Sequence, residues 1–186
     1  SPLEVVDVDL DPPKAGEVQV QMGASGVCHS DLSVVNGTLL SPLPSVLGHE
    51  GAGIVEAVGE GVTSVEPGDH VVLSFVPQCG TCYYCEHDTP EMCETGFMAM
   101  ATGGQLDMTP RFGRGGSPLH QMSGLGTFSE ALVCPEISTV KIDSNVPLTS
   151  AALIGCGVLT GFGAAANTAD VRPGDTVAVI GCGGVG

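Results

Sequence analysis

Short apolar segments bounded by turn residues run through the first 145 residues. Apolar and polar residues alternate over 17–22, and similar short segments cover 51–58, 70–76, 128–134 and 140–142. Gly and Pro separate these segments from one another. Such a pattern predicts β-strands joined by turns. We therefore predict a mainly β first domain, built as a small barrel.

The pattern changes after residue 145. Residues 148–153 and 155–166 have helical character, and the second segment ends in three consecutive alanines, which favour helix. A Pro173-Gly174 turn then leads into the apolar segment 176–180, which we predict to be a buried strand. A helix that feeds such a strand is typical of the start of an α/β unit.

The last six residues, Gly181-Cys182-Gly183-Gly184-Val185-Gly186, match the pattern G-x-G-x-x-G. After an apolar strand this pattern favours a dinucleotide site, because glycines let backbone amides approach phosphate at the start of a helix. So short a pattern also arises by chance. We interpret residues 1–154 as the first domain, and residues 155–186 as a connecting helix, first strand and glycine turn of a truncated second domain.

Composition indicates what fills the core and excludes some classes of partner. With five Phe, two Tyr and no Trp among 186 residues, aliphatic side chains must fill most of the core. Twenty-one acidic residues against five basic ones give a formal charge of −16, which repels nucleic acid and anionic membranes within a Debye length of roughly 8 Å. No apolar run reaches the roughly 20 residues of a membrane span, and the N-terminus does not look like a signal peptide. We expect a cytoplasmic protein with neither nucleic-acid nor membrane partners.

Four cysteines, Cys79, Cys82, Cys85 and Cys93, lie within fifteen residues at spacings of two, two and seven. Four thiols so close together suit a tetrahedral structural Zn²⁺ site. The chain's eight cysteines could instead form four disulfides. Adjacent Cys-x-x-Cys pairs close only tiny loops, and a structural zinc contributes about 10–16 kcal/mol against about 2–4 kcal/mol for a disulfide. We therefore predict a structural zinc lobe over residues 77–94.

A second set of candidate ligands, Cys28, His49 and Cys156, is spread along the sequence. Three protein ligands are the number that a catalytic zinc needs if water or substrate takes the fourth position. Taken one at a time, the histidine could be a hydrogen-bonded core residue and the cysteines buried inert thiols.

Several motifs occur together in an informative order. They are Cys28-His29-Ser30-Asp31, Gly48-His49-Glu50-Gly51, Pro77-Gln78-Cys79-Gly80, Gly155-Cys156-Gly157 and the terminal glycine string. In order and separation the chain resembles zinc-dependent medium-chain alcohol dehydrogenases over essentially its whole length. The resemblance implies a GroES-like barrel followed by the start of a Rossmann domain that binds NAD. Because most of that domain and a returning C-terminal segment are not in this sequence, we expect the chain alone to be inactive.

The same resemblance implies roles for individual residues around the catalytic zinc. It makes Cys28, His49 and Cys156 the ligands, with Glu50 beside the metal and Asp31 orienting the histidine. Ser30 takes the position whose hydroxyl begins a proton relay, which suits a group that donates and accepts at once. Ser33 stands where the relay commonly ends on a histidine, so we expect proton release to be less assisted here.

The resemblance also implies contacts with cofactor and substrate. His29 would lie near the pyrophosphate and Thr160 near the nicotinamide, although His29 could instead be an ordinary exposed surface histidine. The phosphates would meet the glycine string through Gly181, Gly183, Gly184, Val185 and Gly186. Four side chains fall where the family lines its substrate channel, or are ordinary core residues: Leu39, Phe75, Met98 and Met122. An apolar channel favours a primary alcohol or aldehyde with an aliphatic or aromatic body.

The resemblance further implies that the full-length protein is a homo-oligomer. Two alternatives to an enzyme remain at this point. One is an inactive, zinc-stabilised family member with a structural or interaction role, and the other is a thiol redox or zinc-storage module. The number of tightly held zinc ions distinguishes these hypotheses.

Overall fold

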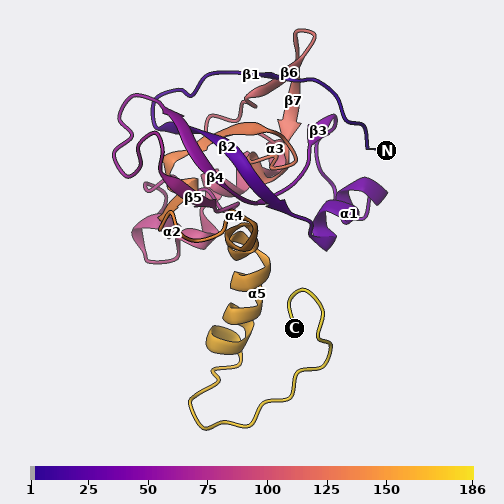
Figure 1. Cartoon of the computed structure of the whole chain (residues 1–186), viewed down its shortest axis with the longest axis vertical. Coiled ribbons are helices and arrows are strands. Elements are labelled where there is room, and N and C mark those ends of the chain that lie inside the picture. Colours follow the sequence, from indigo (N-terminus) through magenta and orange to yellow (C-terminus); the bar gives the residue numbers. More distant parts are fainter. Residues whose placement is uncertain (1–2) are drawn as a thin grey trace.

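The computed structural model describes residues 3–186, and most of them form a β domain with two sheets (Figure 1). The five-stranded sheet is antiparallel throughout, in the order β8 (Ala131–Pro135), β2 (Glu17–Gly26), β4 (Glu50–Val58), β5 (His70–Leu73) and β9 (Thr139–Ile142). The four-stranded sheet has the order β1 (Asp9–Leu10), β6 (Phe112–Arg114), β7 (Ser117–Gln121) and β3 (Ser45–Val46). The predicted mainly β fold is confirmed.

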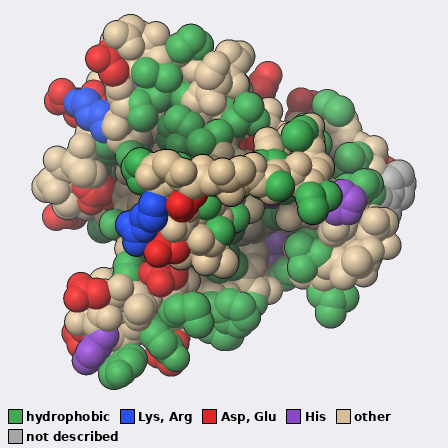
Figure 2. Space-filling view, turned by 90° about the horizontal axis from the view of Figure 1, so that it is seen from below, with side chains coloured by type: hydrophobic (Ala, Val, Ile, Leu, Met, Phe, Trp, Pro, Cys, Tyr) green, Lys and Arg blue, Asp and Glu red, His purple; other side chains and the backbone are tan. Residues whose placement is uncertain are grey.

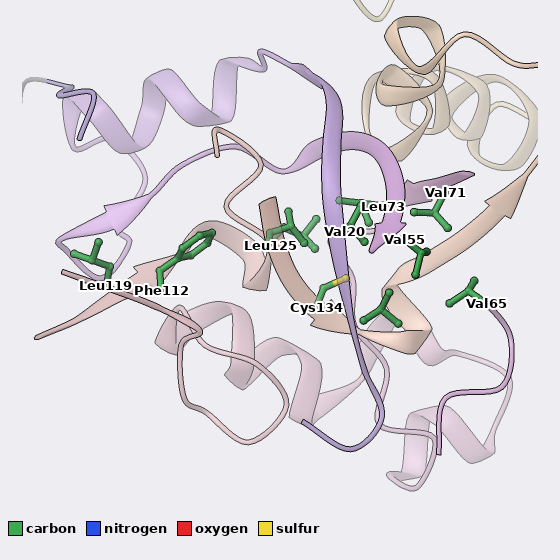
Figure 3. Close-up of a cluster of buried hydrophobic side chains, with 11 residues drawn as sticks. Val20, Val55, Val65, Val71, Leu73, Phe112, Leu119, Leu125 and Cys134 are labelled. Carbon is green, nitrogen blue, oxygen red and sulfur yellow. The ribbon is translucent and has the colours of Figure 1, made fainter. Parts of the chain in front are cut away.

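One hydrophobic core joins the two sheets (Figure 3). Val18, Val20 and Val71 are fully buried within the five-stranded sheet, and Phe112 and Leu119 extend the same cluster to the four-stranded sheet. Phe112 is the one aromatic ring among the buried members of this cluster. The core is therefore aliphatic, as composition predicts.

Short helices occupy connections between strands, and the last four helical segments follow the final strand, β9. They are α1 (His29–Asn36), α2 (Tyr83–Glu86), η1 (Pro90–Met92), α3 (Glu94–Thr102), η2 (Met122–Gly124), η3 (Glu136–Ser138), α4 (Leu148–Ala151), η4 (Ala152–Gly155), α5 (Gly157–Gly163) and the π-helical η5 (Ala164–Thr168). Gly37, with φ of 82°, ends α1 in the left-handed conformation that glycine adopts without strain. Helix α5 leads away from the β domain (Figure 1).

The predicted strand over residues 176–180 is wrong. Residues 169–186 form neither helix nor strand, and Val177, Val179 and Ile180 are exposed. A parallel strand is stable only when neighbouring strands pair with its backbone groups, and none lies beside this segment. In Figure 1 the segment is the yellow loop that ends at the C-terminus. The apolar sequence is present, but the sheet that would bury it is not.

Few basic side chains are visible on the face shown in Figure 2, where acidic ones are scattered. Four of the five basic residues form ion pairs: Lys14 with Asp107, Arg111 with Glu17 and Asp107, Lys141 with Asp69, and Arg172 with Asp170. Within residues 3–186, no single helix is long and apolar enough to cross a membrane. Taken as a pair, Leu148–Gly155 and Gly157–Thr168 reach that length and composition, with a bend of 52° between them.

Candidate metal centres

Three distant segments of the chain converge on one point. Cys28 follows β2 and caps α1, His49 precedes β4, and Cys156 lies between η4 and α5. Ligand atoms of these three residues and of Glu50 all lie within 4.8 Å of one another. We call this group the distributed centre. The predicted ligands are therefore brought together, with Glu50 beside them.

Backbone packing explains why these segments meet. Strands β2 and β4 are antiparallel neighbours with Gly26 opposite Glu50, so the residues just beyond that pair, Cys28 and His49, lie at the same end of the sheet. Gly155 lets η4 approach β5, because a Cβ atom there would lie 2.3 Å from the Leu73 carbonyl oxygen. Cys156 is thereby held against the same end of the sheet.

Asp31 orients the His49 ring through a contact with Nδ1. One carboxylate oxygen of Asp31 lies 3.2 Å from His49 Nδ1, and the other accepts the Cys28 backbone N–H at 2.8 Å. Both side chains are almost completely buried, and the Phe75 ring meets the imidazole edge-on, with centroids 5.4 Å apart. Assigning the Nδ1 proton to the bond with Asp31 leaves Nε2 available to bind a metal.

The two thiol groups of the distributed centre favour a cation between them. Burial raises the pKa of the Cys28 thiol, but hydrogen bonds from Ser30 and His49 outweigh burial and hold this pKa below its ordinary value. Burial lowers the pKa of His49, but Asp31 outweighs burial and raises it. Burial, followed by the negative charge of Cys28, raises the pKa of Cys156 to about 11. A divalent ion between the two sulfurs would remove this repulsion, so the donor set fits zinc.

Gly26 makes room for the buried carboxylate of Glu50. A Cβ atom on Gly26 would lie 2.1 Å from Glu50 Oε2, and one on Gly157 would lie 3.9 Å from Oε1. Glu50 is 4% exposed. Gly26 must therefore lack a side chain for the carboxylate to fit, whereas a Cβ atom on Gly157 would make only an ordinary van der Waals contact.

The residues expected to act around the metal differ in their contacts with the candidate ligands. The Ser30 hydroxyl is 3.7 Å from Cys28 Sγ, and Thr160 Oγ1 is 4.0 Å from Cys156 Sγ. His29, the first residue of α1, is exposed. Ser30 and Thr160 therefore lie beside ligands of the distributed centre, whereas no hydrogen bond within residues 3–186 ties the His29 side chain to it.

The five predicted phosphate-binding residues, Gly181, Gly183, Gly184, Val185 and Gly186, lie in the irregular segment 169–186. The Val185 carbonyl lies against α5, because a Cβ atom on Gly161 would be 2.6 Å from its oxygen. The strand and helix that normally flank a phosphate-binding turn are absent from residues 169–186. This segment therefore does not have the geometry of a dinucleotide site.

The four residues expected to line the substrate channel differ in their surroundings. Phe75 contacts the His49 ring, whereas Met122 is 5% exposed and packs with Val34 and Leu47 in a core cluster. Leu39 and Met98 are exposed. Met122 is thus a core residue, the alternative that its flexible, gap-filling side chain allows.

The four-cysteine lobe, residues 77–94, forms a second and separate group. Ligand atoms of Cys79, Cys82, Cys85 and Cys93 lie within 4.8 Å of one another, with Sγ–Sγ distances of 3.6 Å for Cys82–Cys85 and 3.9 Å for Cys82–Cys93. Four sulfurs at about 2.3 Å from a tetrahedral zinc would be about 3.8 Å apart, whereas a disulfide requires about 2.05 Å. All eight cysteines of the chain are free, so the disulfide alternative is wrong for this structure.

Hydrogen bonds to sulfur are concentrated in the lobe. The backbone N–H groups of Cys79 and Gly96 both donate to Cys93 Sγ at 3.3 Å. Hydrogen bonds, led by the backbone of Thr81, lower the pKa of Cys79 to about 5, whereas desolvation raises the pKa of Cys85 to about 11. Thiols whose pKa values differ so much within one small volume fit a site that binds a cation.

Two residues beside the distributed centre had no role in the sequence-based prediction. Ser25 and Thr127 form a hydroxyl pair next to the Glu50 backbone. They are 102 positions apart, and neither belongs to a ligand pattern. Only the fold shows that they adjoin the centre.

Residues 14–144 match the family described as the alcohol dehydrogenase GroES-like domain. The chain belongs to this family. The predicted family and GroES-like fold are therefore confirmed.

Solved structures of related proteins agree with this assignment. An alcohol dehydrogenase zinc-binding domain protein from Burkholderia ambifaria is similar at 37% identity and a TM-score of 0.81, over 89% of this chain and 45% of that one. Benzyl alcohol dehydrogenase from Acinetobacter calcoaceticus is similar at 35% identity and a TM-score of 0.80, over 89% and 44%. A protein described as NAD-dependent alcohol dehydrogenase is similar at 32% identity and a TM-score of 0.71, over 92% and 45%. The chain thus spans less than half the length of these relatives.

Proposed function

We propose that this chain supplies the catalytic domain of a zinc- and NAD-dependent alcohol dehydrogenase, which interconverts a primary aliphatic or aromatic alcohol and its aldehyde. The observation that carries the proposal is the convergence of Cys28, His49 and Cys156 within 4.8 Å. Similarity to a benzyl alcohol dehydrogenase and to an NAD-dependent alcohol dehydrogenase supports the substrate class and the cofactor. The activity is proposed for a protein of the relatives' length, and this chain alone is expected not to turn over.

In this proposal Cys28, His49 and Cys156 hold the catalytic zinc, and the four-cysteine lobe holds a structural one. Zinc at the distributed centre would supply Lewis-acid chemistry toward the alcohol oxygen. Two thiolates balance the charge of a divalent ion, so the site suits a neutral alcohol. Asp31 keeps the imidazole in the tautomer that leaves Nε2 free, and Glu50 lies beside the ligands as a buried carboxylate.

Ser30 is proposed to carry the proton. Its hydroxyl lies 3.7 Å from Cys28 Sγ, and it can accept the proton of the alcohol while donating its own to water, because Ser33 stands where the relay commonly ends on a histidine. Bound NAD would supply the hydride acceptor. We propose that His29, Thr160 and the terminal glycine string contact this cofactor once residues 155–186 are part of a complete nucleotide domain, with residues 1–154 forming the catalytic domain.

Zinc analysis of the chain tests the assignment. After removal of loosely held metal, we expect about two zinc ions per chain, and about one after Cys28→Ser or Cys156→Ser. Cys182→Ser is the matched control, because this thiol is exposed and outside both groups. A parent chain holding a single zinc in the lobe would support an inactive, zinc-stabilised family member instead. Labile metal with easily oxidised thiols would support a storage module.

A further inference from the structure

A pair of hydroxyl groups lies next to the ligand-bearing segment of β4. Thr127 Oγ1 and Ser25 Oγ are 2.7 Å apart. Thr127, in the loop before β8, is 2% exposed, whereas Ser25 is an exposed residue near the end of β2. The pair therefore joins a buried loop to the strand that leads to Cys28.

The hydrogen bonds of this pair have a direction. Ser25 Oγ lies 2.9 Å from the Glu50 carbonyl oxygen and 3.3 Å from that of Gly26. A carbonyl oxygen only accepts, so the single proton of Ser25 is assigned to the shorter bond, to Glu50. Thr127 must then donate its own proton to Ser25. The result is an ordered chain from Thr127 through Ser25 to the Glu50 backbone.

The loop that contains Thr127 also binds the backbone of the two residues that precede His49 in the chain. The Thr127 N–H donates to the Gly48 carbonyl at 3.0 Å, and the Phe128 N–H donates to the Leu47 carbonyl at 2.9 Å. The peptide before His49 and the peptide after Glu50 are thus both tied, directly or through Ser25, to Thr127. Between these two anchors lie His49 and Glu50, which both contribute ligand atoms.

We propose that Thr127 and Ser25 form a hydroxyl clamp, a pair of positioning residues that set the direction in which His49 and Glu50 face the metal. The clamp rests on the proposed function, because it acts on the ligands of the distributed centre. Ser25 lies three residues before Cys28, so the clamp also joins the strand that leads to Cys28 to the loop that holds the backbone preceding His49. The four-cysteine lobe has no contact with this pair among the hydrogen bonds of residues 3–186.

The test uses the whole chain loaded with Co²⁺, whose absorption reports the geometry of its ligands. Thr127→Val keeps the shape of the side chain and removes its hydroxyl. We expect a loss of metal affinity at the distributed centre of about two- to tenfold, measured by chelator competition, together with a changed Co²⁺ absorption. Metal in the lobe should be unaffected. The contribution of each centre is separated by the same measurement on Cys28→Ser.

Three further variants sharpen the test. Thr127→Ser retains the hydroxyl and should recover the parent spectrum. Ser25→Ala should act in the same direction with a smaller loss, because water reaches this exposed position. Ser129→Ala is the matched control, because its hydroxyl donates to the Gly126 carbonyl at 2.8 Å in the same loop and does not reach Glu50.

Each outcome decides between the two proposals. Parent affinity and absorption in Thr127→Val and Ser25→Ala would overturn the clamp alone, as would an equal loss of metal from both centres. If Thr127→Val does not fold, the result for Ser25→Ala decides. If Cys28→Ser binds as much metal as the parent chain, the distributed centre holds none, and the proposed function falls together with the clamp.

Discussion

The two candidate metal centres are built in opposite ways. The four-cysteine lobe takes its ligands from fifteen consecutive residues and receives backbone hydrogen bonds from within or next to the same segment. The distributed centre takes its ligands from positions 28, 49 and 156, and depends on the packing of β2, β4 and η4. Sequence spacing is therefore sufficient to identify the first, whereas the second exists only in the folded chain.

The largest expected effect comes from removing a ligand of the lobe. Cys82→Ser or Cys85→Ser should abolish metal binding there, at a cost of up to about 10 kcal/mol, comparable to the total stability of a domain. We expect loss of soluble protein, or loss of hydrogen-exchange protection over residues 77–96. Cys182→Ser should change neither. A soluble Cys82→Ser chain with an ordered lobe would contradict the assignment of this lobe as a structural metal site.

Two glycine substitutions should disable the centres separately. Gly96→Ala would place a Cβ atom 1.9 Å from the Pro77 carbonyl oxygen in the lobe. Gly48→Ala would place one 2.4 Å from Thr127 Oγ1 beside the distributed centre, at a φ of 92°. Each should cost about 1–3 kcal/mol of unfolding free energy and release metal from its own centre only.

Gly61→Ala controls for backbone strain, because its φ is 84° and no atom lies within 4 Å of the added Cβ. Chemical denaturation and metal analysis measure both effects. If Gly48→Ala emptied the lobe as well, the two centres would not be independent.

Asp31→Asn tests how far the distributed centre depends on residues that do not touch the metal. The carboxylate of Asp31 meets His49 Nδ1 and the Cys28 N–H, so its replacement should loosen two ligands at once. We expect metal affinity at this centre to fall about 10- to 100-fold, with no change in the lobe. Chelator competition measures the fall. An unchanged affinity would mean that packing alone orients His49.

The same variant gives a pH prediction for the metal-free chain. The pKa of Asp31 is lowered from 3.8, because hydrogen bonds from His49 and the Cys28 N–H outweigh the opposing effect of burial. Its stabilisation is therefore present above that value and is lost as pH falls through the lowered folded pKa. The pKa of His49 is raised from 6.5, so its contribution is present below that value and is lost as pH rises through the raised pKa.

The ion pair should consequently stabilise the metal-free chain most between about pH 4 and pH 6.5. The measurement is the difference in unfolding free energy between the parent and Asp31→Asn, with chelator present, from well below pH 4 to well above pH 6.5, where the difference should fall on both sides. Asp11→Asn is a control at an exposed carboxylate. A difference that does not vary with pH would show that the pair is not charged in the folded chain.

The sequence predicted the elements whose information is local. Val-rich alternation located the central strands β2 and β4, and the cysteine spacing located the lobe. The strand pairs β1–β6 and β3–β7 could not be predicted from the sequence, because β1 and β3 have only two residues each and β7 contains Pro118. Such segments carry no periodic signal, and they become strands only by pairing with distant residues.

Two failures of the prediction have the same physical origin. Residues 176–180 have a strand-like sequence but no partner strands, so their backbone stays unpaired. Thr127 lies 102 residues from Ser25, and no sequence pattern marks their contact. Propensity describes what a segment can form, whereas long-range packing decides what it forms.

The most direct test of the central claim is a crystal structure of the zinc-loaded chain with anomalous scattering recorded at the zinc edge. We predict two anomalous peaks. One should lie about 2.0–2.3 Å from Cys28 Sγ, His49 Nε2 and Cys156 Sγ, and the other about 2.3 Å from the four sulfurs of the lobe. A well-folded chain with no peak between Cys28, His49 and Cys156, or with one of the three turned away from the others, would contradict the account.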